Sequence, residues 1–237
     1  MLVRFYPTLE QADRESLQGS TAVVIDVLRF ASTVIAAMEG GATRVIPVED
    51  IETASRLVQP EDHEVKLLAG EMRGLTVEGF DLGNSPVEFN SDTVGGKIVI
   101  LTTTNGSRAV AASSIANRIL ICAINNVGAV AKAVEDMKEL IILCSGTEGR
   151  FAAEDILCGG MLLEALRKRV TRDSLDDAGR LALLLAETVG GDTEDFLRAV
   201  DHGRYLTSIG FERDVVHCAS KNVSLMVPEV RQGAITA

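Results

Sequence analysis

The sequence predicts an α/β fold with a mixed, largely parallel sheet covered by helices on both faces, followed by a helical C-terminal region. Two observations predict this fold. Short apolar, β-branched runs alternate with segments of helical periodicity up to about residue 170, and beyond it the periodicity is mainly helical. Hydrophobic residues make up 46% of the 237 residues, which is enough for a sizeable core without disulfide or metal support. We expect residues 1–237 to form one unit, and two α/β lobes with a helix-rich tail from about residue 171 remain an alternative.

Each predicted element follows from its local pattern. Continuous apolar, β-branched runs predict strands at residues 21–27, 43–48, 65–69, 97–102, 118–123 and 140–144. Apolar residues at helical spacing, with capping residues and glycine stops, predict helices at residues 32–39, 51–58, 107–114, 127–137 and 153–169. In the tail, helices are expected at residues 175–188, 193–200, 204–208 and 212–219, and a last strand at residues 224–227. Residues 70–90 are rich in Gly and polar side chains, and a connection of that length is usually functional.

Composition and charge exclude several classes of function. The chain has 23 Lys and Arg against 34 Asp and Glu, a formal net charge of −11, and only 4% aromatic residues with no Trp. Such a chain is a poor candidate for binding nucleic acid, which needs a basic surface or stacking platforms. No apolar stretch is long enough to span a membrane, and the first residues lack the apolar core of a signal peptide. We therefore expect a cytoplasmic protein without a membrane partner.

The cysteines and histidines show no metal-binding pattern. The four cysteines form no C-x-x-C pair and are expected to be free thiols in a reducing compartment. They are Cys122, Cys144, Cys158 and Cys218. The three histidines are His63, His202 and His217, and without metal-ligand spacing they are expected to be structural or solvated.

Three junctions share one pattern, in which an apolar strand is followed by a short polar turn and then by the start of a helix. They lie at residues 25–33, 101–108 and 143–150, and each carries an arginine. In open α/β sheets the ligand crevice lies at the carboxyl ends of the strands. Helix N-termini at that edge present unpaired N–H groups, which suit anions. The junctions together therefore predict a site for a small anion.

Carboxylates interspersed with these junctions suggest Mg²⁺. Asp26 ends an otherwise apolar strand, Glu71 lies in the long loop, and Glu154 and Asp155 open the third helix. Mg²⁺ is usually bound by one or two carboxylates together with substrate phosphate oxygens. Two alternatives remain open. Asp26 could form an ion pair with Arg29 or Arg108, because an unpaired buried charge is costly, and the two acids at the helix start could simply favour the helix dipole.

Two known phosphatase motifs can be compared with these residues. The D-x-D signature of haloacid-dehalogenase-type phosphatases is excluded, because Leu28 stands two residues after Asp26. The C-x5-R loop of cysteine phosphatases fits the spacing from Cys144 to Arg150. That mechanism needs a thiolate of lowered pKa, but Glu148 inside the loop would repel a phosphate and no histidine precedes the cysteine. A metal-independent cysteine phosphatase is therefore the weaker enzymatic alternative.

Four segments, in this order, closely resemble the 2-phosphosulfolactate phosphatase family: VVIDVLRFASTVIAAMEGGA, GEMRGLTVEGFDLGNSPVEF, TTTNGSRAV and CSGTEGRFAAEDILCGG. The resemblance covers nearly the whole chain and is weakest beyond Val170. It implies Mg²⁺-dependent hydrolysis of 2-phospho-3-sulfolactate to 3-sulfolactate and phosphate, a step of coenzyme M biosynthesis or of related sulfolactate metabolism. It also implies a homodimer. Other small 2-phospho acids as substrates, or non-catalytic binding of small anions, are the alternative functions.

The residue roles form one hypothesis. Asp26, with Glu154 or Asp155, holds Mg²⁺, and Arg29, Arg108 and the Asn105–Gly106 turn cradle the phosphate. The residues expected to act in catalysis are Asp26, Arg29, Asn105, Arg108 and Glu154. Those expected to take the sulfonate and carboxylate are Arg73, Asn84, Ser85 and Arg150. The further substrate contacts expected at the junctions are Ser32, Thr33, Thr104, Gly106, Ser145 and Gly146. A substrate with three anionic groups requires an acidic chain to concentrate positive charge locally.

Overall fold

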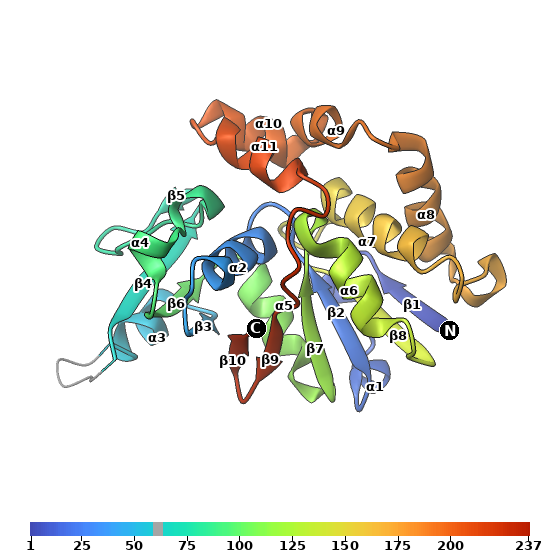
Figure 1. The fold of residues 1–237 in the computed structure, drawn as a ribbon, viewed down its shortest axis with the longest axis horizontal. Helices are drawn as coiled ribbons and strands as arrows, with labels where there is room; N and C mark the ends of the chain where they lie inside the picture. Colours follow the sequence, from blue (N-terminus) through green and yellow to red (C-terminus); the bar gives the residue numbers. More distant parts are fainter. Residues whose placement is uncertain (59–63) are drawn as a thin grey trace.

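A ten-stranded sheet forms the centre of the computed structural model, which describes residues 1–58 and 64–237, so that His63 lies outside the described residues. Its strand order is β1-β8-β2-β7-β9-β10-β3-β6-β4-β5 (Figure 1). The strands are β1 (Leu2–Tyr6), β2 (Thr21–Ile25), β3 (Arg44–Val48), β4 (Lys66–Met72), β5 (Leu75–Thr76), β6 (Ile98–Thr102), β7 (Arg118–Cys122), β8 (Glu139–Cys144), β9 (Glu229–Arg231) and β10 (Ala234–Thr236).

The sheet consists of two parallel groups joined by an antiparallel hairpin. Strands β1, β8, β2 and β7 are parallel to one another, as are β3, β6 and β4. The β9–β10 hairpin lies between the groups, where Glu229 pairs with Leu120 of β7 and Ile235 pairs with Val45 of β3. The predicted mixed, largely parallel sheet is confirmed.

Helices cover both faces because the central strands are apolar on both sides. In β2, Val23 and Ile25 pack in one hydrophobic cluster with α6 and α7, whereas Val24 packs in another with α2 and α5. The helices of this part are α1 (Arg14–Leu17), α2 (Phe30–Glu39), α3 (Ile51–Arg56), α4 (Ser91–Val94), α5 (Gly106–Ala112), α6 (Val127–Val134) and α7 (Ala153–Ala165). Short 3-10 helices lie at Leu9–Gln11, Pro86–Glu88, Ser113–Ile115, Ile124–Asn126 and Arg172–Ser174. The predicted two-sided cover is therefore confirmed.

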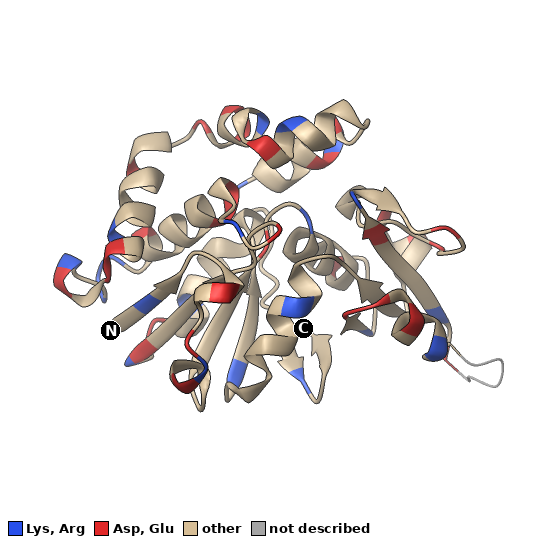
Figure 2. Cartoon of the chain, turned by 180° about the vertical axis from the view of Figure 1, so that it is seen from behind, with Lys and Arg blue, Asp and Glu red and all other residues tan. Residues whose placement is uncertain are grey.

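The C-terminal region is helical, as predicted. It contains α8 (Asp177–Val189), α9 (Thr193–Ala199), α10 (Asp201–Ser208) and α11 (Glu212–Ala219). Figure 1 shows α8 beside α7, and α10 and α11 along the edge of the molecule above α2. Figure 2 shows acidic and basic residues interspersed on these helices, where Arg198 pairs with both Glu194 and Glu212. No helix in the described ranges is long and apolar enough to cross a membrane.

Four sequence-based assignments of strands need correction, and one of them is the β9–β10 hairpin, where no strand was expected. Residues 224–227 do not form the expected strand, because the Ser224 N–H and the Met226 carbonyl bond to Asn125 and Asn126 instead of a neighbouring strand. Strand β1 was not predicted, since its buried Val3 and Phe5 alternate with exposed residues rather than forming a continuous apolar run. The loop predicted at residues 70–90 begins as ordered structure, because β4 continues into it and pairs with β5.

Candidate active site

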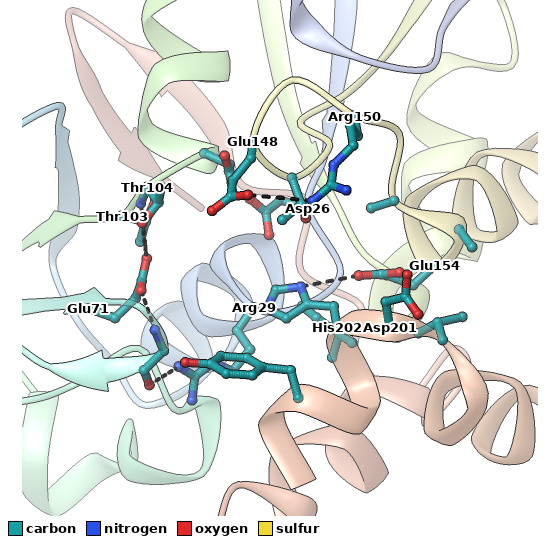
Figure 3. Close-up of a pocket in the computed structure, with 18 of the residues that line it drawn as sticks. Asp26, Arg29, Glu71, Thr103, Thr104, Glu148, Arg150, Glu154, Asp201 and His202 are labelled. Carbon is teal, nitrogen blue, oxygen red and sulfur yellow. Dashed lines mark hydrogen bonds and ion pairs between the residues drawn. The ribbon is translucent and has the colours of Figure 1, made fainter. Parts of the chain in front are cut away.

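A cleft of about 820 Å³ opens at the carboxyl ends of β2, β4, β6 and β8. Each of the three predicted junctions contributes to it, and helix α10 covers one side (Figure 3). The polar and charged residues that line it are Asp26, Arg29, Glu71, Arg73, Asn84, Thr103, Thr104, Asn105, Thr147, Glu148, Arg150, Glu154, Asp201, His202 and Tyr205. The convergence follows from the topology, because parallel strands bring their following turns to one edge of a sheet.

Asp26 lies at the floor of the cleft, directly after β2, and only 6% of it is exposed. Its Oδ1 accepts a hydrogen bond of 3.1 Å from the N–H of Phe30 in the first turn of α2. Burial raises the pKa of Asp26 to about 6, because the charged form loses water; Glu154 and Glu71 raise it further, and His202 opposes the rise. Asp26 therefore changes protonation state nearer to neutral pH than an ordinary carboxyl group.

Glu154 and Asp155 lie in the first turn of α7, and both are buried. Glu154 lines the cleft, where its Oε1 lies 3.3 Å from Nδ1 of His202. Asp155 instead accepts hydrogen bonds from the N–H of Val27 at 2.8 Å and of Gly146 at 3.2 Å. Burial raises the pKa of Asp155 well above its usual value, and the adjacent Asp26 and Glu154 raise it further. Asp155 thus ties together the turns that follow β2 and β8.

Glu71 forms the opposite wall and joins β4 to the turn after β6. Its Oε1 accepts hydrogen bonds from the N–H and the hydroxyl of Thr104, at 3.0 and 2.8 Å. Its Oε2 accepts a bond of 2.7 Å from the N–H of Gly74. This carboxylate therefore fixes two backbone segments that line the cleft.

The three arginines of the cleft differ in how far their charge is compensated. Arg29 is buried and forms an ion pair of 2.7 Å with Asp214 of α11, and it also donates to the carbonyl of Gly74 at 2.6 Å. Arg150 is exposed and lies 3.5 Å from Glu148. No ion pair involves Arg73 among the residues that the structure describes. Arg73 is thus the cleft arginine whose charge is most available to a ligand.

A sequence model of the 2-phosphosulpholactate phosphatase family matches residues 6–233. The chain belongs to this family. A relative from Caldanaerobacter subterraneus, named "probable 2-phosphosulfolactate phosphatase", is 35% identical over 236 residues, which are 99% of this chain and 98% of the relative. A relative of the same name from Caldicellulosiruptor saccharolyticus is 40% identical over 91% of this chain and 90% of its own length. Another, from Clostridium acetobutylicum, is 36% identical over 93% of this chain and 94% of its own length.

Several residues predicted to bind substrate do not line the cleft of this family member. Ser32 and Thr33 are fully buried, and their hydroxyls donate to the carbonyls of Val27 and Asn84. Ser85 donates to Asp214. The others that lie outside the lining are Gly106, Arg108, Ser145, Gly146 and Asp155. Their roles in binding stay predictions, and contact with a ligand in the cleft would require movement of these groups.

Arg108 also lies outside the cleft lining. It was expected to cradle the phosphate, but its side chain is half exposed outside the cleft and lies 4.0 Å from Glu10. The alternative in which Asp26 pairs with Arg29 or Arg108 is also wrong, because these arginines pair with Asp214 and Glu10. Glu154 and Asp155 do lie in the first turn of a helix, as the other alternative expected. Both also lie close enough to Asp26 to affect its charge or to be affected by it.

Cys144 does not fit a nucleophilic role. The residue is fully buried in the core and does not line the cleft. Burial raises its pKa well above the usual value, and the nearby Asp155 raises it further, so the thiolate is disfavoured. The cysteine-phosphatase alternative therefore lacks both access and ionisation.

Sequence reasoning missed some of the cleft residues. Glu71 was noted among the carboxylates near the junctions but was not assigned to the site. It lies near the end of β4, much as Asp26 follows β2, and that parallel could have placed it there. His202, Tyr205 and Asp201 carry no such signal, because only the tertiary placement of α10 brings them to the cleft.

The carboxylates of the cleft fit Mg²⁺ if the substrate supplies some of the ligands. Asp26 and Glu154 are buried carboxylates that face the same cleft, and the charge of Glu154 disfavours the charged form of Asp26. No three His, Cys, Asp or Glu side chains form a metal-holding group within residues 1–58 and 64–237. A site made entirely of protein ligands is thus not supported, whereas two carboxylates completed by substrate oxygens match the usual Mg²⁺ pattern.

Proposed function

We propose that the protein is a Mg²⁺-dependent phosphatase that hydrolyses 2-phospho-3-sulfolactate to 3-sulfolactate and phosphate. The observation that carries the proposal is the convergence of buried Asp26 and Glu154 with three arginines in one cleft at the carboxyl edge of the sheet. Membership of the family and the names of its relatives support the same reaction.

The charge of the cleft favours a role for a divalent cation. Five Asp and Glu residues line it against three Arg, and one of these arginines is already paired with Asp214. The proposed substrate carries a phosphate, a sulfonate and a carboxylate. Such a polyanion would be repelled by the carboxylates unless a cation neutralised them. An acidic cleft and a polyanionic substrate are compatible when metal and substrate bind together.

In this proposal Asp26 and Glu154 hold Mg²⁺, which would neutralise phosphate oxygens and orient the attacking group. The turn of Thr104 and Asn105 after β6 faces the same space and positions the phosphoryl group. His202 limits the movement of Glu154 from the side of α10. Arg29 donates from a fixed position, because Asp214 and the carbonyl of Gly74 hold its guanidinium.

Arg73, Arg150 and Asn84 are proposed to take the sulfonate and the carboxylate. The Asn84 side chain lines the cleft, is 5% exposed, and has no hydrogen-bond partner for its Oδ1 among the described residues. A buried amide without a partner is costly, so a ligand or a water that bonds to it is favoured. The partner of this oxygen must be a donor, such as a water or the 2-hydroxyl of the product, because the sulfonate and the carboxylate only accept hydrogen bonds.

The test is phosphate release from 2-phospho-3-sulfolactate by the purified protein, with Mg²⁺ and with excess EDTA. Turnover that needs the cation supports the proposal. Binding of 3-sulfolactate without any turnover would instead favour a non-catalytic anion-binding protein. Turnover of other 2-phospho acids at equal or higher kcat/KM would reassign the substrate within the same reaction class.

Three related proposals rest on the resemblance to the family rather than on the cleft. The product 3-sulfolactate would serve coenzyme M biosynthesis or related sulfolactate metabolism, the enzyme would act in the cytoplasm, and it would form a homodimer. Cell fractionation with an activity assay tests the location, and light scattering of the purified protein tests the oligomeric state.

A further inference from the structure

The hairpin of β4 and β5 ends in a turn with unusual backbone geometry. Glu71 pairs with Thr76 and Met72 with Leu75, which leaves Arg73 and Gly74 as the two central residues. Both have positive φ, at 52° and 75°. Two positive φ values are the pattern of a type I′ turn, in which Asn-Gly or Gly-Gly is preferred and a long side chain in the first position is disfavoured. The surrounding structure must therefore hold Arg73 in this conformation.

Three hydrogen bonds hold the turn, and two of them come from outside the hairpin. Glu71 accepts from the N–H of Gly74 within the hairpin. The guanidinium of Arg29 donates to the carbonyl of Gly74 at 2.6 Å. The hydroxyl of Tyr205, on α10, donates to the carbonyl of Arg73 at 2.9 Å. Each carbonyl of the turn is thus bound by a side chain that also lines the cleft.

Helix α11 fixes the first of these two outside donors. Asp214 binds Arg29 at 2.7 Å and accepts a second hydrogen bond of 2.6 Å from the hydroxyl of Ser85. The ring of Phe211 lies 4.4 Å below the Arg29 guanidinium, at stacking distance. Both Arg29 and Asp214 are almost completely buried, so the guanidinium has little freedom to move.

Helix α10 also packs directly against the turn. A Cβ atom on Gly74 would lie 2.8 Å from Cδ1 of Ile209 and 3.3 Å from Cε1 of Tyr205. Gly74 is thus favoured by its positive φ, and a larger residue would displace the Ile209 side chain at the end of α10. The position of the turn depends on the tail, although the two are more than 120 residues apart in sequence.

Arg73 is one of the residues that line the cleft, and its guanidinium has no ion pair in the described part of the chain, unlike those of Arg29 and Arg150. An uncompensated guanidinium suits the oxygens of a sulfonate or a carboxylate. The backbone position of Arg73 therefore controls where this group can meet a ligand.

We propose that helices α10 and α11 hold the Arg73–Gly74 turn in place, and that Tyr205 and Asp214 are positioning residues that set the preference for substrates with a sulfonate beside the phosphate. Tyr205 acts on the carbonyl of Arg73, and Asp214 acts on that of Gly74 through Arg29. This inference rests on the proposed phosphatase function and names residues that determine its substrate selectivity.

The first test compares Tyr205→Phe with the wild type on 2-phospho-3-sulfolactate and on 2-phospholactate, which has the same backbone without the sulfonate. Loss of one hydrogen bond to the turn should lower the ratio of kcat/KM values for the two substrates by about three- to tenfold. The change should lie mainly in KM for the sulfonated substrate. The affinity for the product 3-sulfolactate, measured by calorimetry, should fall by a similar factor.

Tyr6→Phe is the matched control, because Tyr6 is the other of the two tyrosines and lies at the end of β1 outside the cleft lining. It should leave the substrate ratio unchanged. Asp214→Asn is the second variant. It should lower the ratio in the same direction, with an additional loss of kcat on both substrates because Arg29 also loses its partner.

The possible outcomes distinguish a failure of this inference from a failure of the proposed function. A substrate ratio unchanged in Tyr205→Phe and Asp214→Asn, with a wild-type enzyme that hydrolyses both substrates, overturns the inference alone. Equal losses on both substrates, with a lower melting temperature, show a merely structural role and also overturn it. A wild-type protein that hydrolyses neither substrate overturns the proposed function, and the inference with it.

Discussion

Asp26→Asn tests whether the buried carboxylate at the floor of the cleft is a cation ligand. Asn keeps the shape of the side chain, and its Oδ1 can still accept the hydrogen bond from the N–H of Phe30. The substitution removes a negative charge that burial and the neighbouring Glu154 and Glu71 already disfavour. We therefore expect a folded variant with almost no turnover that is more stable than the wild type when no divalent cation is present.

The size of this stabilisation follows from the pKa. A rise from 3.8 to about 6 corresponds, at about 1.4 kcal/mol per pH unit, to about 3 kcal/mol. Because the pKa is higher in the folded chain, Asp26 favours folding most below pH 3.8, and this contribution is lost as the pH rises through about 6. The stability of the variant relative to the wild type should therefore increase as the pH rises from 3.8 to about 6. At about 2–4 °C per kcal/mol for a chain of this size, the gain is about 6–12 °C at pH 8.

Thermal melts of both proteins in EDTA and in excess Mg²⁺, at pH 4 and pH 8, provide the measurement. The variant should melt higher than the wild type in EDTA at pH 8, and the difference should shrink at pH 4. Added Mg²⁺ should raise the melting temperature of the wild type and leave the variant nearly unchanged, since binding to the folded state stabilises it. A variant that melts lower than the wild type in EDTA, with near-normal kcat, would refute both the metal role and the charge argument.

The remaining predictions concern four other residues and need only steady-state kinetics. Cys144→Ser should keep substantial activity, and its complete loss in a folded variant would restore the cysteine-phosphatase mechanism. Arg73→Ala should raise KM for the sulfonated substrate by about 10–100-fold with little change in kcat, because charge-assisted hydrogen bonds are lost from both ground and transition states. Arg108→Ala should leave kcat close to the wild-type value, and a large fall would show that Arg108 reaches the phosphoryl group. Glu154→Gln should abolish the response of activity to Mg²⁺, whereas a wild-type response would exclude it as a ligand.

The sequence predicted the sheet and the edge that carries the cleft because both depend on local patterns. Apolar runs such as residues 21–25 are long enough to identify buried strands, and the polar turns after them identify their carboxyl ends. Asp26 was recognisable because a carboxylate at the end of an apolar strand needs an explanation. Glu154 was recognisable through its place at a helix start beside a junction.

The rest of the site depends on contacts that no local pattern encodes. Asp214 and His202 lie in amphipathic tail helices that look like ordinary solvated surfaces. Arg29 was expected to face a phosphate, and nothing in its neighbourhood of sequence shows that a carboxylate 185 residues later binds it. Arg108 shows how a local pattern can differ from the placement of a side chain. Its turn is close to the cleft, but one helical turn is enough to direct a side chain to the outer surface.

In the proposed function, the tail helps an acidic chain to keep a defined site for a polyanion. Asp214 compensates the charge of Arg29, so this arginine mainly orders the turn that it binds, and Arg73 retains its charge for a ligand. On the opposite side, burial and the neighbouring Glu154 and Glu71 make the negative charge of Asp26 costly at neutral pH. Cation and anionic substrate would relieve this cost together, so we expect each to bind more tightly in the presence of the other. Calorimetric titration of 3-sulfolactate with and without Mg²⁺ measures this coupling, and equal affinities in the two conditions would show that the carboxylates and the arginines act independently.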